Sequence, residues 1–375
     1  MKLAIISHTE HFTDLDGNLV GWGPTIREIN YLTKHFECIY HLACYYSTNA
    51  PKSALAYSSP NIKFIPLPAF GGRGMVQKLS VLTTAPKIIR EVNKILSEVD
   101  ALQLRLPTGM GNYLLPYLSF KKNKPFIWVK YAGNWAENNA PLGYRFQKWW
   151  LLNNFLKCPV TINGKWPNQP KHCISFENPC IDEQEQQIGA EILKTKNYNT
   201  PLTGIFLGRL ETWKGVDRII ESLPTLIAKG FETFHFVGGG EKLTSYKDLV
   251  NKTNLPIRVV FHDYLSRDKI SPLLIESHVI LLLSDNEGFP KVIAEAANYG
   301  CVPIVSNVSS IPHYINESNG FLWDINCSFK EFLGSITLSS ETLSDKAKAA
   351  FEMSKLFTFE KYADRILELI NTNRE

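Results

Sequence analysis

The sequence contains no long hydrophobic run. No apolar stretch approaches the roughly 20 residues that a helix needs to cross the hydrocarbon core of a bilayer. Residues 1–7 are typical of a first β-strand, and no long apolar segment follows them, so we expect no secretory signal peptide. We therefore expect a cytoplasmic protein without a membrane-spanning helix.

Cysteine is scarce as well. The seven cysteines are odd in number and scattered along the chain, and no two of them form a C-x-x-C pair. This pattern suits a reducing compartment and argues against a disulfide framework and against a structural zinc site. Asp14 and Asp16 resemble a metal-binding D-x-D pair, but no further cluster of ligands accompanies them, so we expect no bound metal.

Acidic residues are few in the first half of the chain. Residues 1–180 hold 20 Lys and Arg against 10 Asp and Glu, a net charge of +10, whereas residues 181–375 hold 20 and 26, a net of −6. A basic half suits an anionic partner such as a membrane surface, a lipid-linked phosphate or nucleic acid. Lysines that merely keep a large domain soluble explain the same count, and both interpretations stay open.

The length predicts two domains, because 375 residues exceed the size at which a single core stops growing. We expect an N-terminal domain over residues 1–182 and a second domain over residues 200–355. The polar segment 184–199 is predicted to be the linker between them. Residues 356–375 are predicted to form a C-terminal helix.

Residues 279–305 contain the most informative pattern. An apolar run at 279–283 predicts a buried strand, and the polar residues 284–289 predict a loop at its carboxyl end. Pro290 suits the first turn of a helix, Gly300 suits its end, and residues 302–305 predict the next strand.

This geometry predicts a binding site. Ligands of open α/β sheets collect at the carboxyl ends of strands, where the free N–H groups of the next helix favour anionic or hydroxyl-rich ligands. Glu287 lies in the loop and Glu295 lies one to two turns along the helix. Each carboxylate can accept hydrogen bonds from a vicinal diol. An exposed Glu pair on an ordinary amphipathic helix is the alternative.

The sequence from Glu287 to Ala296, EGFPKVIAEA, followed by GCVPIV at 300–305, resembles the E-x7-E signature of retaining glycosyltransferases of family 4. That family has the GT-B fold, an α/β fold of two Rossmann-like domains facing a central cleft. The resemblance implies that Glu287 binds hydroxyls of the donor sugar and that Glu295 binds the nucleotide ribose. It assigns the rest of the loop to donor binding as well: Gly288, Phe289, Pro290 and Lys291.

A second motif precedes the first by about 75 residues. Gly208-Arg209 and Lys214-Gly215 resemble the G-R-x(4)-K-G motif of the same family, whose Arg and Lys grip the nucleotide diphosphate. The arginine guanidinium offers a planar fork of hydrogen-bond donors and the lysine ammonium a mobile point charge, and both stabilise a departing diphosphate. Glu287, Arg209 and Lys214 are thus the expected catalytic residues, and Tyr264 lies where relatives place the nucleobase.

In the first half the resemblance rests on strand order and loop placement. A long polar loop is predicted from His8 to Pro24, before a helix over residues 25–36. Gly23 in this loop corresponds to a Gly-rich segment that faces the donor phosphates in relatives, although a flexible turn explains it equally well.

Two strands of the first domain end without the histidines that relatives often carry there. The strand at 101–106 has Arg105, and the strand at 126–131 is followed by Asn134. Arg105 could stabilise charge on the leaving phosphate, and Asn134 could hold the acceptor or the donor sugar. Either could instead be a structural hydrogen-bonding residue.

Two helices complete the interpretation. The helix predicted at 144–152 is basic and aromatic, which suits either core packing or anchoring at a membrane interface by Trp and Lys. The terminal helix predicted at 359–370 resembles the one that crosses back onto the N-terminal domain in the GT-B fold.

The resemblance implies transfer of a sugar from a nucleoside-diphosphate sugar, UDP- or GDP-linked, to a hydroxyl of a glycan or lipid-linked acceptor with retained configuration. A role in bacterial surface polysaccharide biosynthesis and a peripheral position on the inner face of the cytoplasmic membrane fit this activity. No cofactor, metal or nucleic acid is expected. A GT-B epimerase or hydrolase acting on the nucleotide sugar, or an inactive nucleotide-sugar-binding protein, are the alternatives.

Overall fold

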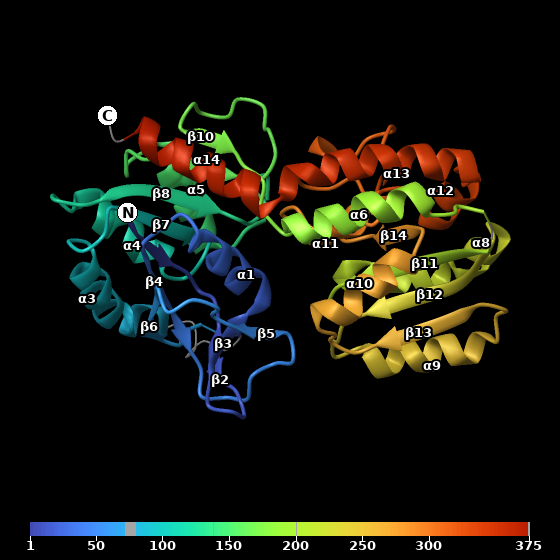
Figure 1. Ribbon diagram of the computed structural model, residues 1–375, viewed down its shortest axis with the longest axis horizontal. Helices are drawn as coiled ribbons and strands as arrows, with labels where there is room; N and C mark the ends of the chain where they lie inside the picture. The colour runs from blue at the N-terminus through green and yellow to red at the C-terminus, as the bar shows by residue number, and fades with distance from the viewer. Residues whose placement is uncertain (72–79, 138, 200, 374–375) are drawn as a thin grey trace. The chain divides into compact units, whose positions relative to one another are not determined.

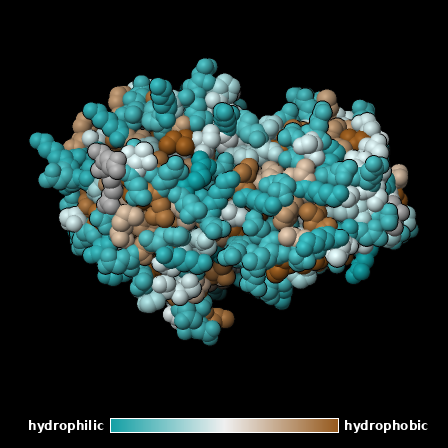
Figure 2. Space-filling model, turned by 45° about the horizontal axis from the view of Figure 1, so that its top comes forward, coloured by the Kyte–Doolittle hydropathy of each residue, from teal (hydrophilic) through white to brown (hydrophobic). Residues whose placement is uncertain are grey.

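The computed structural model describes residues 1–71, 80–137, 139–199 and 201–373. The chain forms two compact α/β units (Figure 1), one from residues 1–177 with 361–375 and the other from residues 178–360. Within the described ranges, no helix is long and apolar enough to cross a membrane. Hydrophilic residues cover most of the face drawn in Figure 2, and hydrophobic residues there form small separate groups.

The first unit is built on a mostly parallel sheet. Its parallel strands are β1 (Lys2–Ile6), β4 (Cys38–Tyr45), β6 (Ile62–Pro68), β7 (Ala101–Leu106), β8 (Phe126–Tyr131), β9 (Val160–Ile162) and β10 (Cys173–Ser175). They follow the order β10-β9-β8-β7-β1-β4, and β6 pairs with β4. The short strands β2 (His11–Thr13), β3 (Leu19–Trp22) and β5 (Ala54–Ala56) extend the sheet beyond β4.

The prediction of a long loop from His8 to Pro24 is wrong, because β2 and β3 form an antiparallel hairpin within this segment. The carboxylate of Asp14 accepts hydrogen bonds from the backbone N–H groups of Asp16 (3.0 Å) and Asn18 (2.7 Å), which closes the turn. Gly17 has a φ of +82°, a conformation that favours glycine. Asp14 is therefore a turn residue.

Helices cover both faces of this sheet. They are α1 (Gly23–Leu32), α3 (Ala85–Ile95), α4 (Gly111–Phe120), α5 (Leu142–Leu152) and α14 (Phe359–Thr372). Side chains alternate along β1, so that Leu3 and Ile5 pack with α1 and α14, whereas Ala4 and Ile6 pack with α3, α4 and α5. Residues 361–373 of the chain therefore complete the core of the first unit, far from it in sequence.

The second unit has a six-stranded sheet in the order β13-β12-β11-β14-β15-β16, parallel throughout. The strands are β11 (Leu202–Leu207), β12 (Phe231–Val237), β13 (Arg258–His262), β14 (Val279–Leu282), β15 (Val302–Ser306) and β16 (Phe321–Trp323). The helices are α6 (Glu183–Thr195), α7 (Val216–Glu221), α8 (Leu223–Ala228), α9 (Leu243–Thr253), α10 (Arg267–Glu276), α11 (Lys291–Asn298), α12 (Phe329–Ser335) and α13 (Ser340–Ser354). Residues of β11 and β14 reach hydrophobic clusters on both faces, as expected of strands in a covered parallel sheet.

The linker predicted at 184–199 is wrong, because α6 occupies most of it. Asp182 and Glu185 form a capping box in which each side chain accepts a hydrogen bond from the other residue's backbone N–H. The amide of Asn298 donates to the carbonyl of Glu185 (2.8 Å), and a Cβ at Gly189 would lie 2.1 Å from the carbonyl oxygen of Asn298. Close packing on α11 thus holds this polar helix in the second unit.

Two histidines are fully buried in the first unit. His11 and His41 both hydrogen-bond the hydroxyl of Tyr57, at 2.8 and 2.6 Å. Burial lowers the pKa of His11 to about 4. Burial, His11 and Arg105 together lower the pKa of His41 well below its usual value. Both imidazoles are therefore neutral at pH 7 and remain so under mild acid.

We expect the free energy of unfolding to fall between pH 7 and pH 5. The unfolded chain binds protons at its histidines near pH 6.5, whereas folded His11 does so only near pH 4, so acid favours the unfolded state. At pH 5 this linkage costs about 2 kcal/mol for one such histidine. Urea unfolding of the wild type and of His11→Gln at both pH values measures it. An equal pH difference in both proteins would contradict the assignment.

Candidate functional site

The second sheet has a topological switch at β11. This strand pairs with β12 on one side and with β14 on the other, so consecutive chain segments leave it in opposite directions. Because all strands are parallel, the loops after β11 (208–215) and after β14 (283–290) open at the same edge. Crevices of this kind are where open α/β sheets bind ligands.

Lys214 and Glu287 meet at this edge as an ion pair, although 73 residues separate them. The same oxygen of Glu287 accepts a hydrogen bond from the hydroxyl of Ser284 (2.8 Å). The side chains are only 15% and 11% exposed, so the two charges compensate each other in a largely desolvated place. Lys214 Nζ also lies 4.4 Å from the centroid of the Trp213 ring.

Glycine permits the two loops to come this close. Gly215 follows a 3-10 turn at Thr212–Lys214 with a φ of +78°, and a Cβ there would lie 2.2 Å from the carbonyl oxygen of Leu283. The Arg218 guanidinium donates to that carbonyl (2.8 Å) and to Asp285 (2.6 Å). Backbone contact and a cation therefore join the loop after β11 to the loop after β14.

Three serines that the sequence reasoning missed hold the Glu287 loop from the other side. The hydroxyl of Ser306 donates to the carbonyl of Ser284 (2.7 Å), and that of Ser310 donates to the carbonyl of Gly288 (2.8 Å). Ser309 Oγ accepts from the backbone N–H of Glu287 (3.2 Å). The sequence does contain a sign of these serines, because an S-x-x-S-S pattern begins directly after the predicted strand 302–305.

The residues after Glu287 serve the loop and the helix that follows. Phe289 is buried and stacks on Phe357 with ring centroids 4.5 Å apart, so its side chain anchors the loop in the core. Pro290 occupies the N-cap of α11, and Lys291 is the first helical residue. In the described structure no side chain caps this helix, which leaves its first N–H groups available to a ligand.

Glu295 lies on α11 with a different partner. Its carboxylate pairs with Arg267 at 2.7 Å, and Arg267 also pairs with Glu185 at 2.7 Å. Burial disfavours the charge of Arg267, but the two carboxylates outweigh it and raise its pKa above the usual value. Glu287 and Glu295 are therefore two separate polar positions, and sequence reasoning missed Arg267.

The remaining predicted residues of the second unit are more exposed. Arg209 is 58% exposed and pairs with Glu211 at 2.8 Å. Tyr264 is 44% exposed, and its ring packs so closely on Gly239 that a Cβ there would lie 2.4 Å away. Gly208 lies beneath the same glycine-rich turn, because a Cβ at Gly238 would lie 2.0 Å from the Gly208 carbonyl oxygen. The loop after β11 thus carries an exposed guanidinium, and an exposed ring lies beside the neighbouring glycine-rich turn.

In the first unit, two of the three predicted positions already have local roles. A Cβ at Gly23, the first residue of α1, would lie 2.7 Å from the carbonyl oxygen of Ser53, so close packing explains the glycine. Asn134 Oδ1 accepts from the backbone N–H of Ala136 (2.9 Å), which makes a local turn.

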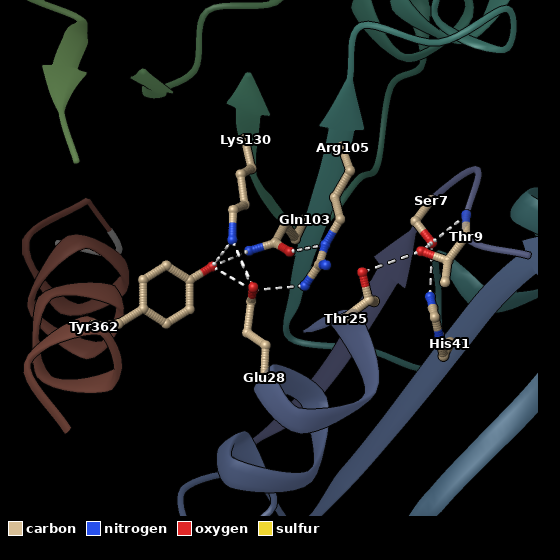
Figure 3. A network of polar contacts seen from close by, with 9 residues as sticks. All are labelled: Ser7, Thr9, Thr25, Glu28, His41, Gln103, Arg105, Lys130 and Tyr362. Atoms are coloured by element: carbon tan, nitrogen blue, oxygen red, sulfur yellow. Dashed lines mark hydrogen bonds and ion pairs between the residues drawn. The ribbon is translucent and has the colours of Figure 1, made fainter. Parts of the chain in front are cut away.

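Arg105 belongs to a buried network around Glu28 (Figure 3). The carboxylate of Glu28, 1% exposed, accepts hydrogen bonds from Arg105 (2.7 Å), Lys130 (2.8 Å) and the hydroxyl of Tyr362 (2.7 Å). Arg105 also donates to Gln103 (2.7 Å). Its charge is therefore used to compensate a buried carboxylate, and neither Lys130 nor Tyr362 was predicted from the sequence.

We expect Gly215→Ala to lower the free energy of unfolding by about 1–3 kcal/mol, because the new Cβ would overlap the Leu283 carbonyl and strain a left-handed backbone. Gly334→Ala is the matched control. Apart from its chain neighbours and the backbone of its own helix, no described atom lies within 4 Å of a Cβ built there, and alanine in a helix favours folding by up to about 1 kcal/mol. Thermal unfolding of both variants measures the difference, and equal midpoints would contradict the close approach.

The second unit matches a known family in sequence. Residues 190–353 match the family model of glycosyl transferases group 1. An uncharacterized glycosyltransferase of Methanocaldococcus jannaschii is 25% identical over 119 residues, which are 32% of this chain and 30% of that protein. The matched segment thus spans about a third of the length of this relative.

The fold is shared over almost the whole chain. Sucrose-phosphate synthase from Thermosynechococcus elongatus superposes with a TM-score of 0.71 at 15% identity, covering 99% of this chain and 98% of the other. HepE of Anabaena in complex with UDP gives a TM-score of 0.68 at 14% identity, covering 99% and 100%. The predicted α/β GT-B fold is therefore confirmed, and the second unit of the chain has the sequence pattern of the group 1 glycosyl transferases.

Proposed function

We propose that this protein is a retaining glycosyltransferase of the E-x7-E type that uses a nucleoside-diphosphate sugar, UDP- or GDP-linked. The observation that carries the proposal is the ion pair of Lys214 and Glu287 at the switch point of the second sheet. It lies beside the uncapped start of α11 and within the segment that matches the group 1 glycosyl transferases. A cation, a carboxylate and free N–H groups together suit a ligand with both a diphosphate and sugar hydroxyls.

Binding of the diphosphate would change the partner of Lys214. A diphosphate group carries more negative charge than one carboxylate group and therefore attracts Lys214 more strongly. Arg209 is exposed and can bind the same diphosphate beside Lys214. As Lys214 turns to the diphosphate, Glu287 becomes free to accept hydrogen bonds from donor-sugar hydroxyls. Ser309 and Ser284 keep its loop in place during the exchange. The empty site is thus self-neutralised, and the donor separates its charges.

The nucleoside end fits the other two polar positions. Glu295 can accept hydrogen bonds from a ribose diol. Arg267 Nη1 pairs with Glu295 at 2.7 Å and so holds this carboxylate in position. The exposed ring of Tyr264 offers a flat surface for the nucleobase.

The proposed step breaks the bond between the anomeric carbon and the diphosphate oxygen and forms one from that carbon to an acceptor hydroxyl oxygen. The hydroxyl proton leaves with the nucleoside diphosphate. Arg209 and Lys214 stabilise the charge that develops on the leaving group, so we expect no metal or cofactor to be required. Among the described residues, no three His, Cys, Asp or Glu side chains gather as a metal site.

The acceptor is proposed to be a hydroxyl of a glycan or lipid-linked molecule, in the biosynthesis of a bacterial surface polysaccharide. An inactive nucleotide-sugar-binding protein is the second candidate. The observation that favours it is that Arg105 and Asn134, at the ends of β7 and β8, are both engaged within the first unit. A hydrolase or epimerase acting on the donor alone is the third.

We expect Arg209→Ala and Lys214→Ala each to weaken binding of the nucleoside diphosphate by about 1.5–3 kcal/mol, the contribution of hydrogen bonds to charged groups. Nucleoside affinity should barely change. Calorimetry with UDP and uridine, and with GDP and guanosine, measures both, and the exposed Lys330→Ala on α12 is the control. Equal losses for nucleoside and nucleoside diphosphate would refute the assignment.

Incubation with a panel of nucleotide sugars, with and without acceptor extracts, tests the activity itself. We expect acceptor-dependent transfer, a product with the donor's anomeric configuration, and turnover that survives a chelator. NMR of the first-formed product reads the configuration. Inversion or strict metal dependence would count against the proposed class. Free sugar or an epimer without acceptor would identify a hydrolase or epimerase, and binding without turnover an inactive protein.

A further inference from the structure

A group of large apolar side chains is exposed at one corner of the first unit. We call it the aromatic corner and define it as Phe120, Trp149, Leu152 and Phe155, which are 81%, 51%, 38% and 43% exposed. Phe120 ends α4, and the other three lie at or just beyond the end of α5. Exposed apolar groups that gather on one part of a surface mark interaction sites.

A hydrogen bond between the two helices brings the ends of α4 and α5 together. The indole N–H of Trp150 donates to Ser119 Oγ at 3.0 Å, which places α5 beside the residue that precedes Phe120. The rings of Trp149 and Trp150 have centroids 6.1 Å apart, and Phe155 lies 5.2 and 5.1 Å from them. Trp150 packs on the core of the unit, so the corner rests on rigid structure.

Lysines follow the two segments that form the corner. Residues 101–176 contain ten Lys and Arg and a single acidic residue, Glu137. Lys121 and Lys122 follow Phe120, and Lys157 follows Phe155 by two residues. Both Lys122 and Lys157 are exposed. Exposed lysines therefore lie close in sequence to the exposed aromatic rings.

An open cavity of about 540 Å³ adjoins the corner. Lys124 and Lys157 line it together with Leu156 and Pro125, next to Phe155. Asp100 also lines it and accepts a hydrogen bond from the backbone N–H of Lys2 (2.7 Å). Lys157 is exposed, and Lys124 Nζ also donates to the carbonyl of Leu118 (2.9 Å). Two lysines that line an open cavity suit an anionic headgroup.

The corner and the cavity lie away from the edge expected to bind substrate. The helices α4 and α5 lead into β8 and β9, so their ends lie at the amino-terminal edge of the sheet. Arg105 and Asn134 lie at the opposite, carboxyl-terminal edge of β7 and β8. A surface that docks at the corner therefore leaves that edge of the sheet open.

We propose that the aromatic corner docks this protein on an anionic membrane leaflet, with headgroups at the lysine-lined cavity. Aromatic rings and lysine stems are the groups that insert at a membrane interface, and nearby lysines are attracted to anionic lipids. A second protein copy fits less well, because lysine is depleted in protein interfaces whereas here it rims the patch. Docking does not depend on sugar transfer, because it uses a surface away from the edge expected to bind substrate.

Flotation of the full-length protein with vesicles tests the proposal. We compare vesicles of phosphatidylcholine alone with vesicles that also contain phosphatidylglycerol, at low and high salt. We expect binding only to the anionic vesicles, a steep loss with salt because lysine attraction is screened, and a residue of binding from apolar burial that salt does not screen. Absence of binding to anionic vesicles at low salt would overturn the proposal, whatever the donor assays show.

Variants locate the surface. Lys122→Gln and Lys157→Gln should each weaken vesicle binding about fivefold at low salt, the effect of one basic residue near an anionic leaflet. Trp149→Ala with Phe155→Ala should remove the salt-resistant fraction. The control variants are Lys252→Gln and Leu249→Ala on α9. Lys252 is exposed and Leu249 is 43% exposed, and both variants should bind vesicles like the wild type.

Unfolding midpoints and donor affinity of the variants should match the wild type, which separates lost docking from lost folding. Equal weakening by the α9 variants would overturn the assignment of the surface. Sedimentation distinguishes the other occupant. A wild-type dimer that becomes monomeric in the Trp149→Ala, Phe155→Ala variant, without vesicle binding, would assign the corner to self-association and overturn the membrane proposal.

Discussion

The ion pair of Lys214 and Glu287 depends on one constraint of the second unit, its fully parallel sheet. Parallel strands end at a common edge, and the pairing of β11 with β14 brings two loops together that are far apart in the sequence. The pair then requires a close backbone approach, which Gly215 permits, and a fixed glutamate loop, which the serines after β15 provide. Two opposite charges in a poorly hydrated place stabilise each other only when both are held in this way. The polar site is thus a consequence of the strand order.

The first unit solves a similar problem with a different result. Glu28 is a buried carboxylate, and burying such a charge is costly unless cations and hydrogen-bond donors surround it. Arg105, Lys130 and Tyr362 supply them, so this carboxylate is compensated within the first unit. Tyr362 lies on α14, so the same network connects the end of the chain to α1 and to β8. Arg105, which the sequence placed at a substrate edge, is one of the cations that pair with this carboxylate.

Much of the second unit follows from local sequence. The apolar run at 279–283, the polar loop and Pro290 predict β14 and α11, because strand length, turn residues and helix starts are properties of neighbouring residues. Polar composition wrongly predicted a linker at residues 184–199, where α6 lies, and glycine content wrongly predicted a loop at residues 8–24, where β2 and β3 form a hairpin. Asn298 binds α6 through a hydrogen bond to Glu185, and the turn at Asp14 allows β2 to pair with β3. Local composition does not predict such contacts.

The sequence by itself determined the two α/β halves, several of their strands and the positions of Glu287 in a loop and Glu295 on a helix. Tertiary structure decided which groups these residues contact. Lys214 pairs with Glu287, Arg267 separates Glu295 from that pair, and Tyr362 reaches Glu28 across 334 residues of chain. A motif records spacing along the chain, whereas the charge and hydrogen-bonding state of a side chain depends on groups brought near it in space. Only the packing of the sheets and helices brings those groups together.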